Sequence, residues 1–580
     1  MCVSNEPSLC ILCYVNVGIT NLNIIYIVMR PKMFCYQCQE TVANTGCTLR
    51  GVCGKDPTVS AAMDLLLFVV RGVSVVATRL GCIMCEADHK RVNRFVTDAL
   101  FCTITNANFS YDSIVDRICR GIELRNSLLT VAGQRGVDVP MVDEVIWNGL
   151  RDDCASKARS VGVLAEPDED LRSLKQLILY GLKGMAAYLY HAMQLGHDDT
   201  HIHQFMQSTL ASMTLMTMAT DELLRLTLQV GEYGVKAMAL LDAANTQNYG
   251  NPVVTHVNLG VGYRPGILVS GHDLHDLMML LEQSEGQGID VYTHGEMLPA
   301  HYYPAFRSFH HFMGNYGGAW WQQHSDFEAF GGPILFTSNC IVPPPKGAGY
   351  STRVFTTNSS AYPGWRHIEA DEKGRKDFSE IINEARRSRP PRQIEKGSIV
   401  GGYAHNQMEQ IADSLVSAVR SGDIRRIIVM AGCDGRMPNR RYYTEFASQL
   451  PHDMVILTAG CAKYRYIKLD LGTINGIPRV LDAGQCNDCY SIVLTALRLR
   501  DALGLTDINE LPVTYNIAWY EQKAVIVLLA LLSLGVKDIH LGPTLPAFLS
   551  PYVRSVLAEH LGLSTISTAQ SDLEEWGLNG

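Results

Sequence analysis

Four cysteines each follow directly on a short apolar run in the second half of the chain. The runs ILFTSNC, IIVMAGC, VILTAGC and VLDAGQC end at Cys340, Cys433, Cys461 and Cys486. A β-branched run stopped by a turn of small residues predicts a buried strand of an open α/β sheet, which binds ligands at the carboxyl ends of its strands. We therefore expect four thiols at one crevice, where they would select an iron–sulfur centre, zinc or copper. Ordinary core cysteines are the alternative, but the repeated placement favours metal.

Composition points to an intracellular redox protein. The chain has 580 residues, enough for three or four domains, and 49 basic against 58 acidic residues give a net charge of −9. No basic tract is long enough to indicate nucleic-acid binding. The 17 cysteines, in a chain without the look of a secreted disulfide scaffold, predict thiols used as ligands in a reducing compartment, the cytoplasm.

The first 32 residues differ from the rest. They carry no charged side chain from Pro7 to Met29, which is long enough to consider a membrane span or a targeting segment. Internal asparagines and basic residues that follow the apolar stretch, instead of preceding it, argue against both. We expect residues 1–32 to be an upstream extension without a structural role and expect no stable membrane association, although organellar targeting stays open. Cys10 and Cys13 have CxxC spacing without further ligands nearby.

A cysteine-rich loop follows Met33. In MFCYQCQETVANTGCTLRGVCGK the thiols are Cys35, Cys38, Cys47 and Cys53, with glycines that permit sharp bends. A loop of this length can wrap one cuboidal iron–sulfur cluster, and a structural zinc site is the alternative. A second cysteine set in the same chain favours iron, because two iron–sulfur centres form an electron relay.

Helical periodicity dominates residues 57–245. In DLRSLKQLILYGLKGMAAYLYHAM apolar residues recur at three- and four-residue steps, and Asp170 is the expected N-cap. This region predicts helical bundles. A histidine cluster and a CxxC pair lie in it: His197, His201, His203, Cys82 and Cys85. We interpret the histidines as part of a solvated helix start, in preference to a metal site, and both groups as structural or incidental.

The α/β half adds ligands other than thiols. The predicted strands GILVSGHD and IDVYTHGE lead to His272 and Glu296, on the strand ends where the cysteines also lie. Glu521 and Lys523 precede a thirteen-residue apolar run that predicts a buried helix, and burying both charges is costly unless they ligate or pair. Four thiols with one imidazole and two carboxylates imply an iron centre with sulfur and oxygen bridges and an open coordination position.

Other catalytic motifs are absent from the sequence: there is no phosphate loop, dinucleotide fingerprint, GxSxG or HExxH. The chemistry is therefore expected to come from metal, acting on small N–O or oxygen-containing molecules.

From Met33 onward the chain resembles the hybrid-cluster proteins, also called prismane proteins or hydroxylamine reductases. The resemblance rests on MFCYQCQET, GHDL, VYTHGEMLPA, TSNC, VMAGCDGR, LTAGCAKYRY, VLDAGQCND and WYEQKA. It implies a multidomain α plus α/β fold. After the extension 1–32 we expect a helical-bundle domain at 33–250 and two Rossmann-like domains at 251–392 and 393–580, with a hybrid cluster at the domain interface.

The resemblance also implies the cofactors. The spacing of the first four cysteines is similar to the class I form, which holds a [4Fe-4S] cluster. The implied ligands of the hybrid [4Fe-2O-2S] cluster are His272, Glu296, Cys340, Cys433, Cys461, Cys486 and Glu521. Cys433 would carry a persulfide, and Lys523 matches a lysine beside the cluster. This chain departs from the family pattern at Cys489, where a serine is expected, and we expect that thiol to point elsewhere.

The implied activity is two-electron reduction of hydroxylamine to ammonia and water, with Glu296, Glu521, Lys523 and Cys433 in catalytic roles and a small electron-donor protein as partner. Nitric oxide reduction at the same site is an alternative. So is a regulator that nitrosates thiols of partner proteins through Cys433. Carbon monoxide dehydrogenase resembles this architecture, but the histidine and two glutamates argue against it.

Overall fold

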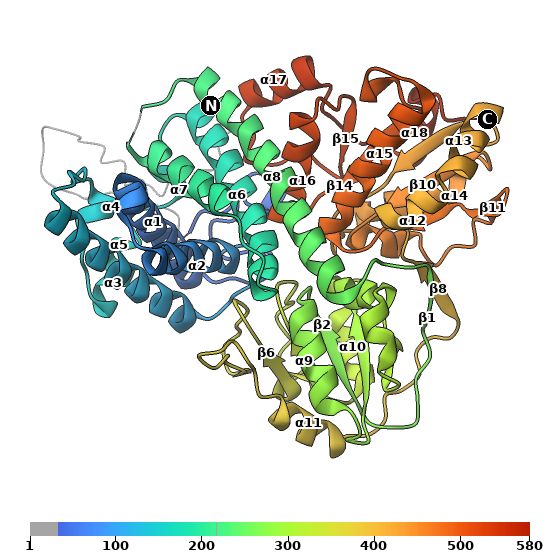
Figure 1. Ribbon diagram of the computed structural model, residues 1–580, viewed down its shortest axis with the longest axis horizontal. Coiled ribbons are helices and arrows are strands. Elements are labelled where there is room, and N and C mark those ends of the chain that lie inside the picture. Colours follow the sequence, from blue (N-terminus) through green and yellow to red (C-terminus); the bar gives the residue numbers. More distant parts are fainter. Residues whose placement is uncertain (1–32, 216, 580) are drawn as a thin grey trace, which may run out of the picture.

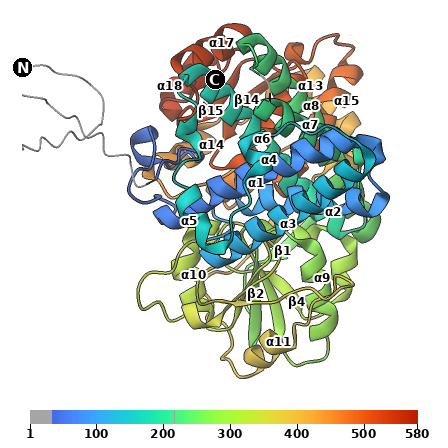
Figure 2. The same cartoon turned by 90° about the vertical axis from the view of Figure 1, so that its left-hand side faces the viewer.

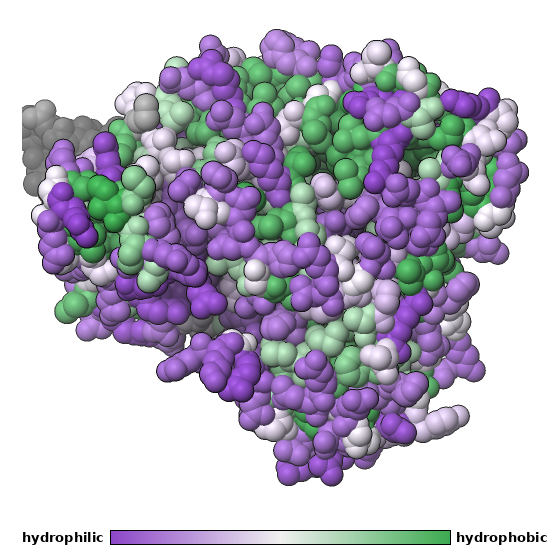
Figure 3. All heavy atoms as spheres, in the orientation of Figure 1, coloured by the Kyte–Doolittle hydropathy of each residue, from purple (hydrophilic) through white to green (hydrophobic). Residues whose placement is uncertain are grey.

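The computed structural model describes residues 33–215 and 217–579, so the predicted extension with Cys10 and Cys13 lies outside the described residues. A helical part and two parallel sheets make up the fold (Figure 1). Figure 2 shows α1, α2 and α3 at mid-height, between the sheet that contains β2 and the sheet that contains β14. Hydrophilic side chains predominate on the face in Figure 3, interrupted by separate hydrophobic patches.

The helical part confirms the periodicity in the sequence. Its helices are α1 (Pro57–Leu80), α2 (Glu86–Cys102), α3 (Tyr111–Arg135), α4 (Asp143–Ile146), α5 (Cys154–Lys157), α6 (Glu169–Gln194), α7 (Thr200–Leu215) and α8 (Thr220–Tyr249).

Two helix starts show how local chemistry sets their bounds. Asp56 caps α1 by accepting from the N–H groups of Thr58 and Val59, both at 2.9 Å. At α6 the predicted cap Asp170 is wrong, because Asp168 accepts from the N–H groups of Asp170 and Leu171 instead. Either aspartate of the run DED could cap the helix, and the backbone position decides which one does. The segment Pro57–Ile83 is long and apolar enough to cross a membrane, but 83% of its most apolar window is buried in the fold.

The first parallel sheet has the strand order β4-β3-β2-β5-β6-β7. Its strands are β2 (Gly266–Ser270), β3 (Asp290–His294), β4 (Phe312–Asn315), β5 (Ile334–Phe336), β6 (Val354–Thr356) and β7 (Arg366–His367). The helices of this region are α9 (Leu274–Ser284), α10 (Gln323–Phe330) and α11 (Ser379–Arg386). Strands β2 and β3 are buried at every position, as both faces of a parallel sheet require.

The second parallel sheet has the order β13-β10-β9-β14-β15-β16. Its strands are β9 (Arg426–Val429), β10 (Met454–Thr458), β13 (Val480–Asp482), β14 (Val513–Ala518), β15 (Ile539–Gly542) and β16 (Ser564–Thr565). Its region contains α12 (His405–Gln410), α13 (Ala412–Ser421), α14 (Arg441–Gln449), α15 (Cys489–Leu503), α16 (Gln522–Ser533), α17 (Pro551–Leu561) and α18 (Ala569–Glu575). Two antiparallel pairs complete the strands: β1 (Thr255–Asn258) with β8 (Ser398–Gly401), and β11 (Thr473–Ile474) with β12 (Ile477–Pro478).

Each sheet reverses its strand order once. The reversal lies between β2 and β5 in the first sheet and between β9 and β14 in the second. Loops that leave adjacent strand ends diverge at such a point, and the gap between them is where open α/β sheets bind ligands. His272 and Cys340 follow the first pair of strands, and Cys433 and Glu521 follow the second. The candidate ligands therefore lie at both reversal points.

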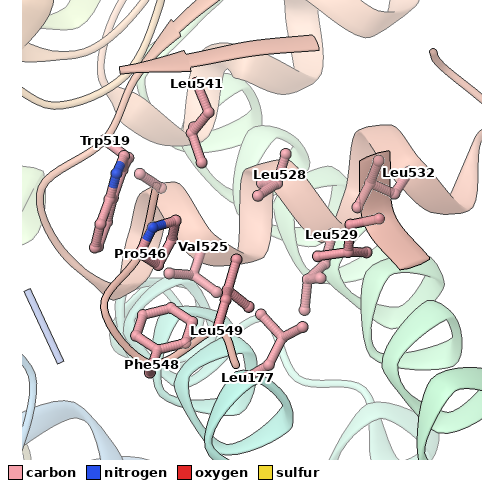
Figure 4. A pocket seen from close by; sticks show the side chains of 12 residues that line it. Leu177, Trp519, Val525, Leu528, Leu529, Leu532, Leu541, Pro546, Phe548 and Leu549 are labelled. Carbon is pink, nitrogen blue, oxygen red and sulfur yellow. The ribbon is translucent and has the colours of Figure 1, made fainter. Parts of the chain in front are cut away.

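Helix α16 belongs to the C-terminal region of the chain but packs against α6 and α8 of the helical part. Glycines permit the approach: a Cβ atom at Gly184 would lie 2.3 Å from the carbonyl oxygen of Gln522, and one at Gly231 would lie 2.1 Å from that of Leu529. Side chains of α16 also line an apolar pocket together with Leu177 of α6, Trp519 and Phe548 (Figure 4). Residues 522–532 of α16 are all buried, which confirms the predicted buried helix.

Gly184→Ala should displace the start of α16, because the new methyl group meets backbone that cannot rotate away. We expect the unfolding midpoint to fall, with a loss of about 1–3 kcal/mol in stability. Thermal unfolding followed by circular dichroism measures it. Gly133→Ala in α3 is the matched control, since a Cβ atom there meets nothing within 4 Å. Equal midpoints for the two variants would contradict the close approach.

Candidate metal centres

The four cysteines of the second half all follow strands, as the sequence predicts. Cys340 comes after β5, Cys433 after β9, Cys461 after β10 and Cys486 after β13. The last three are buried, with exposed fractions of 9, 5 and 7%, and Cys340 is half-buried. Parallel strands end at one edge of their sheet, so the fold brings these thiols toward the interface between the two sheets.

Three donors of different chemistry converge on one point. Ligand atoms of His272, Glu296 and Cys486 lie within 4.8 Å of one another, and all three residues are buried. His272 follows β2, Glu296 stands in the 3₁₀ helix after β3, and Cys486 opens the 3₁₀ helix after β13. Two separate sheets therefore build one donor set.

Hydrogen bonds orient the imidazole of His272. Its Nδ1 atom lies 2.9 Å from Oγ of Ser338, and its Nε2 atom lies 2.8 Å from Nζ of Lys523. A proton on Nδ1, donated to Ser338, leaves a lone pair on Nε2, which accepts from the ammonium group or ligates a metal. Asn339 accepts a second hydrogen bond from Lys523 at 2.9 Å. The lysine predicted to lie beside the site is thus in contact with it.

The carboxylate of Glu296 is only half satisfied. Its Oε2 atom accepts from the N–H of Cys486 at 3.1 Å, whereas Oε1 is buried without a hydrogen-bond partner among the described residues. A buried, unpaired carboxylate oxygen is costly and calls for a ligand. Gln485 fixes the surroundings, because its amide donates to the carbonyl oxygens of Glu296 at 2.8 Å and His272 at 3.2 Å.

Glu521 and Cys340 are two further candidate ligands, one from each reversal point. Glu521 caps α16 by accepting from the N–H of Lys523 at 2.9 Å, and its other carboxylate oxygen lies 3.7 Å from Nζ of that lysine. Cys340 has φ of +87°, a region that non-glycine residues occupy at a cost of about 1–3 kcal/mol. The amide of Asn339 lies 3.6 Å from its sulfur. Such local strain is typical of functional positions.

Electrostatics in this site favour a bound cation. Burial raises the pKa of Cys486 to about 12, against the lowering effect of Lys523, and Glu296 raises it further. Burial likewise raises the pKa of the Glu296 and Glu521 carboxyls above their usual range. Burial by itself would lower the pKa of Lys523, but the charges of Cys486, Glu521 and Cys340 raise it above its usual value. Burial thus favours the protonated thiol and carboxyls, and a multivalent cation would offset the charge of their ionised forms.

The N-terminal cysteines form a separate set. Cys35, Cys38, Cys47 and Cys53 line one cavity, and the first and third are joined by backbone hydrogen bonds of 3.1 and 2.8 Å. Among the described residues, no three of these sulfurs lie within 4.8 Å of one another. Four thiols around one cavity can serve as ligands of a metal ion or of a cluster.

Hydrogen bonds join the chain segments that carry Cys38 and Glu521. The N–H of Gln39 donates to the carbonyl oxygen of Tyr520 at 3.0 Å, and the Gln522 amide donates to the carbonyl oxygen of Gln37 at 2.7 Å. Cys38 and Glu521, one from each set, are therefore on chain segments in contact.

Other singled-out residues stay apart from these sets. His203 is buried and pairs with Asp198 at 2.6 Å, so it is not part of the solvated helix start that the sequence predicts, whereas His201 is exposed and His197 is half-buried. Cys82 and Cys85 are exposed. Cys489 is buried in the first turn of α15, and it is not one of the three converging donors. The same holds for Cys340, Cys433, Cys461 and Glu521, which the structure does not bring within 4.8 Å of all three members of that group.

Sequence reasoning missed three residues that hold the site: Ser338, Asn339 and Gln485. Each stands one or two positions before a predicted cysteine ligand. Polar residues in a turn between a buried strand and a ligand are a pattern that could have identified them.

Comparisons with known proteins agree with this architecture. The model of the Prismane/CO dehydrogenase family matches residues 33–574. Proteins named hydroxylamine reductase are 57% identical in Porphyromonas gingivalis, over 94% of this chain and 99% of the relative, and 54% in Clostridium tetani, over the same shares. The one in Bacteroides thetaiotaomicron is 58% identical, over 93% of this chain and 99% of its own length.

Solved structures share the fold at low identity. Carbon monoxide dehydrogenase from Thermococcus sp. AM4 superposes with a TM-score of 0.51 at 18% identity, covering 94% of this chain and 92% of that one. Carbon monoxide dehydrogenase IV from Carboxydothermus hydrogenoformans gives 0.53 at 14%, with 93 and 91% covered. These likenesses confirm the predicted combination of helical and α/β regions. As its sequence motifs predict, the chain belongs to the Prismane/CO dehydrogenase family.

Proposed function

We propose that this chain reduces hydroxylamine to ammonia and water at the donor set between the two sheets. The reaction consumes two electrons and two protons: NH₂OH + 2e⁻ + 2H⁺ gives NH₃ + H₂O. The observation that carries the proposal is the convergence of His272, Glu296 and Cys486, a mixed set unlike that of a simple thiolate cluster. Relatives that match over 99% of their length and bear the name hydroxylamine reductase support it.

Both donor sets are proposed to hold iron and sulfur. The N-terminal thiols would hold a [4Fe-4S] cluster, which suits their spacing around one cavity. The second set would hold a hybrid [4Fe-2O-2S] cluster through His272, Glu296, Cys340, Cys433, Cys461, Cys486 and Glu521, where soft thiols and hard carboxylates match sulfur-rich and oxygen-rich iron. When bound, this centre supplies electrons and an open coordination position.

The residues around that position manage protons and orientation. Lys523 stays charged among acidic neighbours, and its Nζ atom can donate a proton to the oxygen that leaves as water. Glu296 and Glu521 are placed to hold or relay protons at their free oxygens. Ser338 keeps the imidazole of His272 in one orientation. Cys433 is proposed to carry a persulfide.

Electrons are proposed to enter at the N-terminal set. A small electron-donor protein would dock near the loop 35–53, and the hydrogen-bonded segments at residues 37–39 and 520–522 would carry electrons inward. The cytoplasmic location expected from the cysteine usage remains a prediction.

Anaerobic purification with iron and sulfide counting, electron paramagnetic resonance and hydroxylamine turnover tests the function. We expect two distinct iron–sulfur signals, ammonia formed from hydroxylamine, and no stoichiometric nickel or zinc. Stoichiometric nickel with carbon monoxide oxidation would overturn the proposal in favour of the other branch of the family. A single type of cluster would contradict the relay.

A further inference from the structure

A small polar cavity lies behind the proposed hybrid site. Helix α6 contributes His191, α8 contributes Asn245, and the start of α9 contributes His275. His272 and Gln485, which belong to the site and its support, line the same space. The helical part and both sheet regions therefore meet at this cavity, which one of the converging donors, His272, also lines.

One group in this cavity is conspicuously unpaired. The Nδ1 atom of His191 lies 3.0 Å from a carboxylate oxygen of Asp273, whose other oxygen accepts from the N–H of Asp276 at 2.9 Å. The residue is 8% exposed, and its Nε2 atom is buried without a hydrogen-bond partner among the described residues. A buried polar atom without a partner is uncommon and calls for a ligand or water.

The ring of His191 lies next to a candidate ligand of the proposed hybrid site. The imidazoles of His191 and His272 are stacked with centroids 6.5 Å apart and planes 23° apart. With Nδ1 facing Asp273, the neutral imidazole tautomer that donates from Nδ1 presents the lone pair of Nε2 as an acceptor. A molecule that donates a hydrogen bond to Nε2 would lie close to the imidazole of His272.

Hydroxylamine can donate the hydrogen bond that Nε2 of His191 lacks. It has two heavy atoms, with N–H and O–H donors and lone pairs on both atoms. Nitric oxide has no hydrogen to donate to Nε2. We propose that the cavity is a holding subsite in which Nε2 of His191 accepts a hydrogen bond from hydroxylamine on its way to the donor set. The inference rests on the proposed function and makes His191 a specificity-determining residue.

Two substitutions distinguish the roles of the two ring nitrogens of His191. His191→Asn keeps a donor near the position of Nδ1, and so the contact to Asp273, but removes Nε2. His191→Gln places an amide near the position of Nε2. We expect KM for hydroxylamine to rise about two- to tenfold in His191→Asn, as for one lost hydrogen bond, with kcat within about twofold of the parent. His191→Gln should recover part of the affinity.

A binding measurement without turnover accompanies the kinetics. Calorimetric titration of the oxidised holoenzyme with hydroxylamine, in the absence of an electron donor, should show the same order of affinities. His203→Asn is the control, because His203 is also buried and paired with an aspartate, but both of its ring nitrogens have partners and it lies outside the cavity. The two iron–sulfur signals should be unchanged in all variants.

Unchanged KM and unchanged binding in His191→Asn would overturn the subsite and leave the cavity to water alone. Equal losses in His191→Asn and His203→Asn would overturn it as well, since any buried histidine would then have the effect. If the parent enzyme does not reduce hydroxylamine, the proposed function fails, and the titration still decides whether hydroxylamine binds at His191.

Discussion

Cys461→Ser should remove the hybrid cluster and leave the N-terminal cluster in place. The two donor sets draw on separate parts of the chain, and Cys461 is a buried thiol at the end of β10 that a hydroxyl group cannot replace as a soft ligand. We expect the variant to lose roughly half of its iron, one of its two paramagnetic signals, and hydroxylamine turnover by at least about 100-fold. Iron counting and spectroscopy on the anaerobic protein measure this.

Two further cysteine variants are controls for this result, one expected to be silent and one expected to have the reciprocal effect. Cys489→Ser changes a buried thiol that is not among the proposed ligands and should be nearly silent. Cys53→Ser should have the reciprocal effect and remove the N-terminal cluster alone. If Cys489→Ser lost the hybrid cluster while Cys461→Ser or Cys486→Ser kept it, the assignment of ligands in AGCAK and AGQCNDC would be wrong.

Glu521→Gln should reduce hydroxylamine turnover on the order of 100-fold while the protein stays folded. The amide has almost the same volume, and its oxygen can still accept from the N–H of Lys523, so the start of α16 is kept. The variant would lose the negative charge and the hard ligand that we propose for an oxygen-rich iron of the hybrid cluster. Steady-state turnover together with the unfolding midpoint separates the chemical effect from a structural one.

A surface glutamate provides the comparison for Glu521. Glu395→Gln alters a partly exposed ion pair with Lys468 and should leave turnover unchanged. Thiol nitrosation that needs only Cys433 should survive Glu521→Gln, so measuring both activities on this variant distinguishes the reductase from the regulator. Turnover near the parent level would make Glu521 a structural acid and remove one oxygen ligand from the proposed cluster.

Residues in the strand-turn pattern could be predicted from the sequence because the information is local. An apolar run followed by small residues identifies a strand end, and this places Cys433 and Cys461 without any knowledge of their neighbours. The buried helix after Glu521 follows from the same kind of local pattern. For this reason the fold class and the placement of the candidate ligands at strand ends could be predicted from the sequence.

Contacts between segments that are distant in the sequence could not be predicted from it. His191 reads as one more residue of an amphipathic helix, and only the packing of α6 against the start of α9 brings it to Asp273. His203 has polar neighbours in the sequence, but the helix α7 turns it inward, where it meets Asp198 and Thr97. Asp168 and Asp170 are equivalent as caps until the backbone is known. In each case the deciding partner or geometry comes from the three-dimensional fold.

The contact between the two donor sets also constrains when the protein can become active. The Gln522 amide and the carbonyl oxygen of Gln37 are 485 positions apart in the chain, and the second donor set extends from His272 to Glu521. Synthesis proceeds from the N-terminus, so the four cysteines at positions 35–53 leave the ribosome early. The second set is complete only when nearly the whole chain has been made. The metal centre proposed for it could therefore be assembled only late in translation or after it.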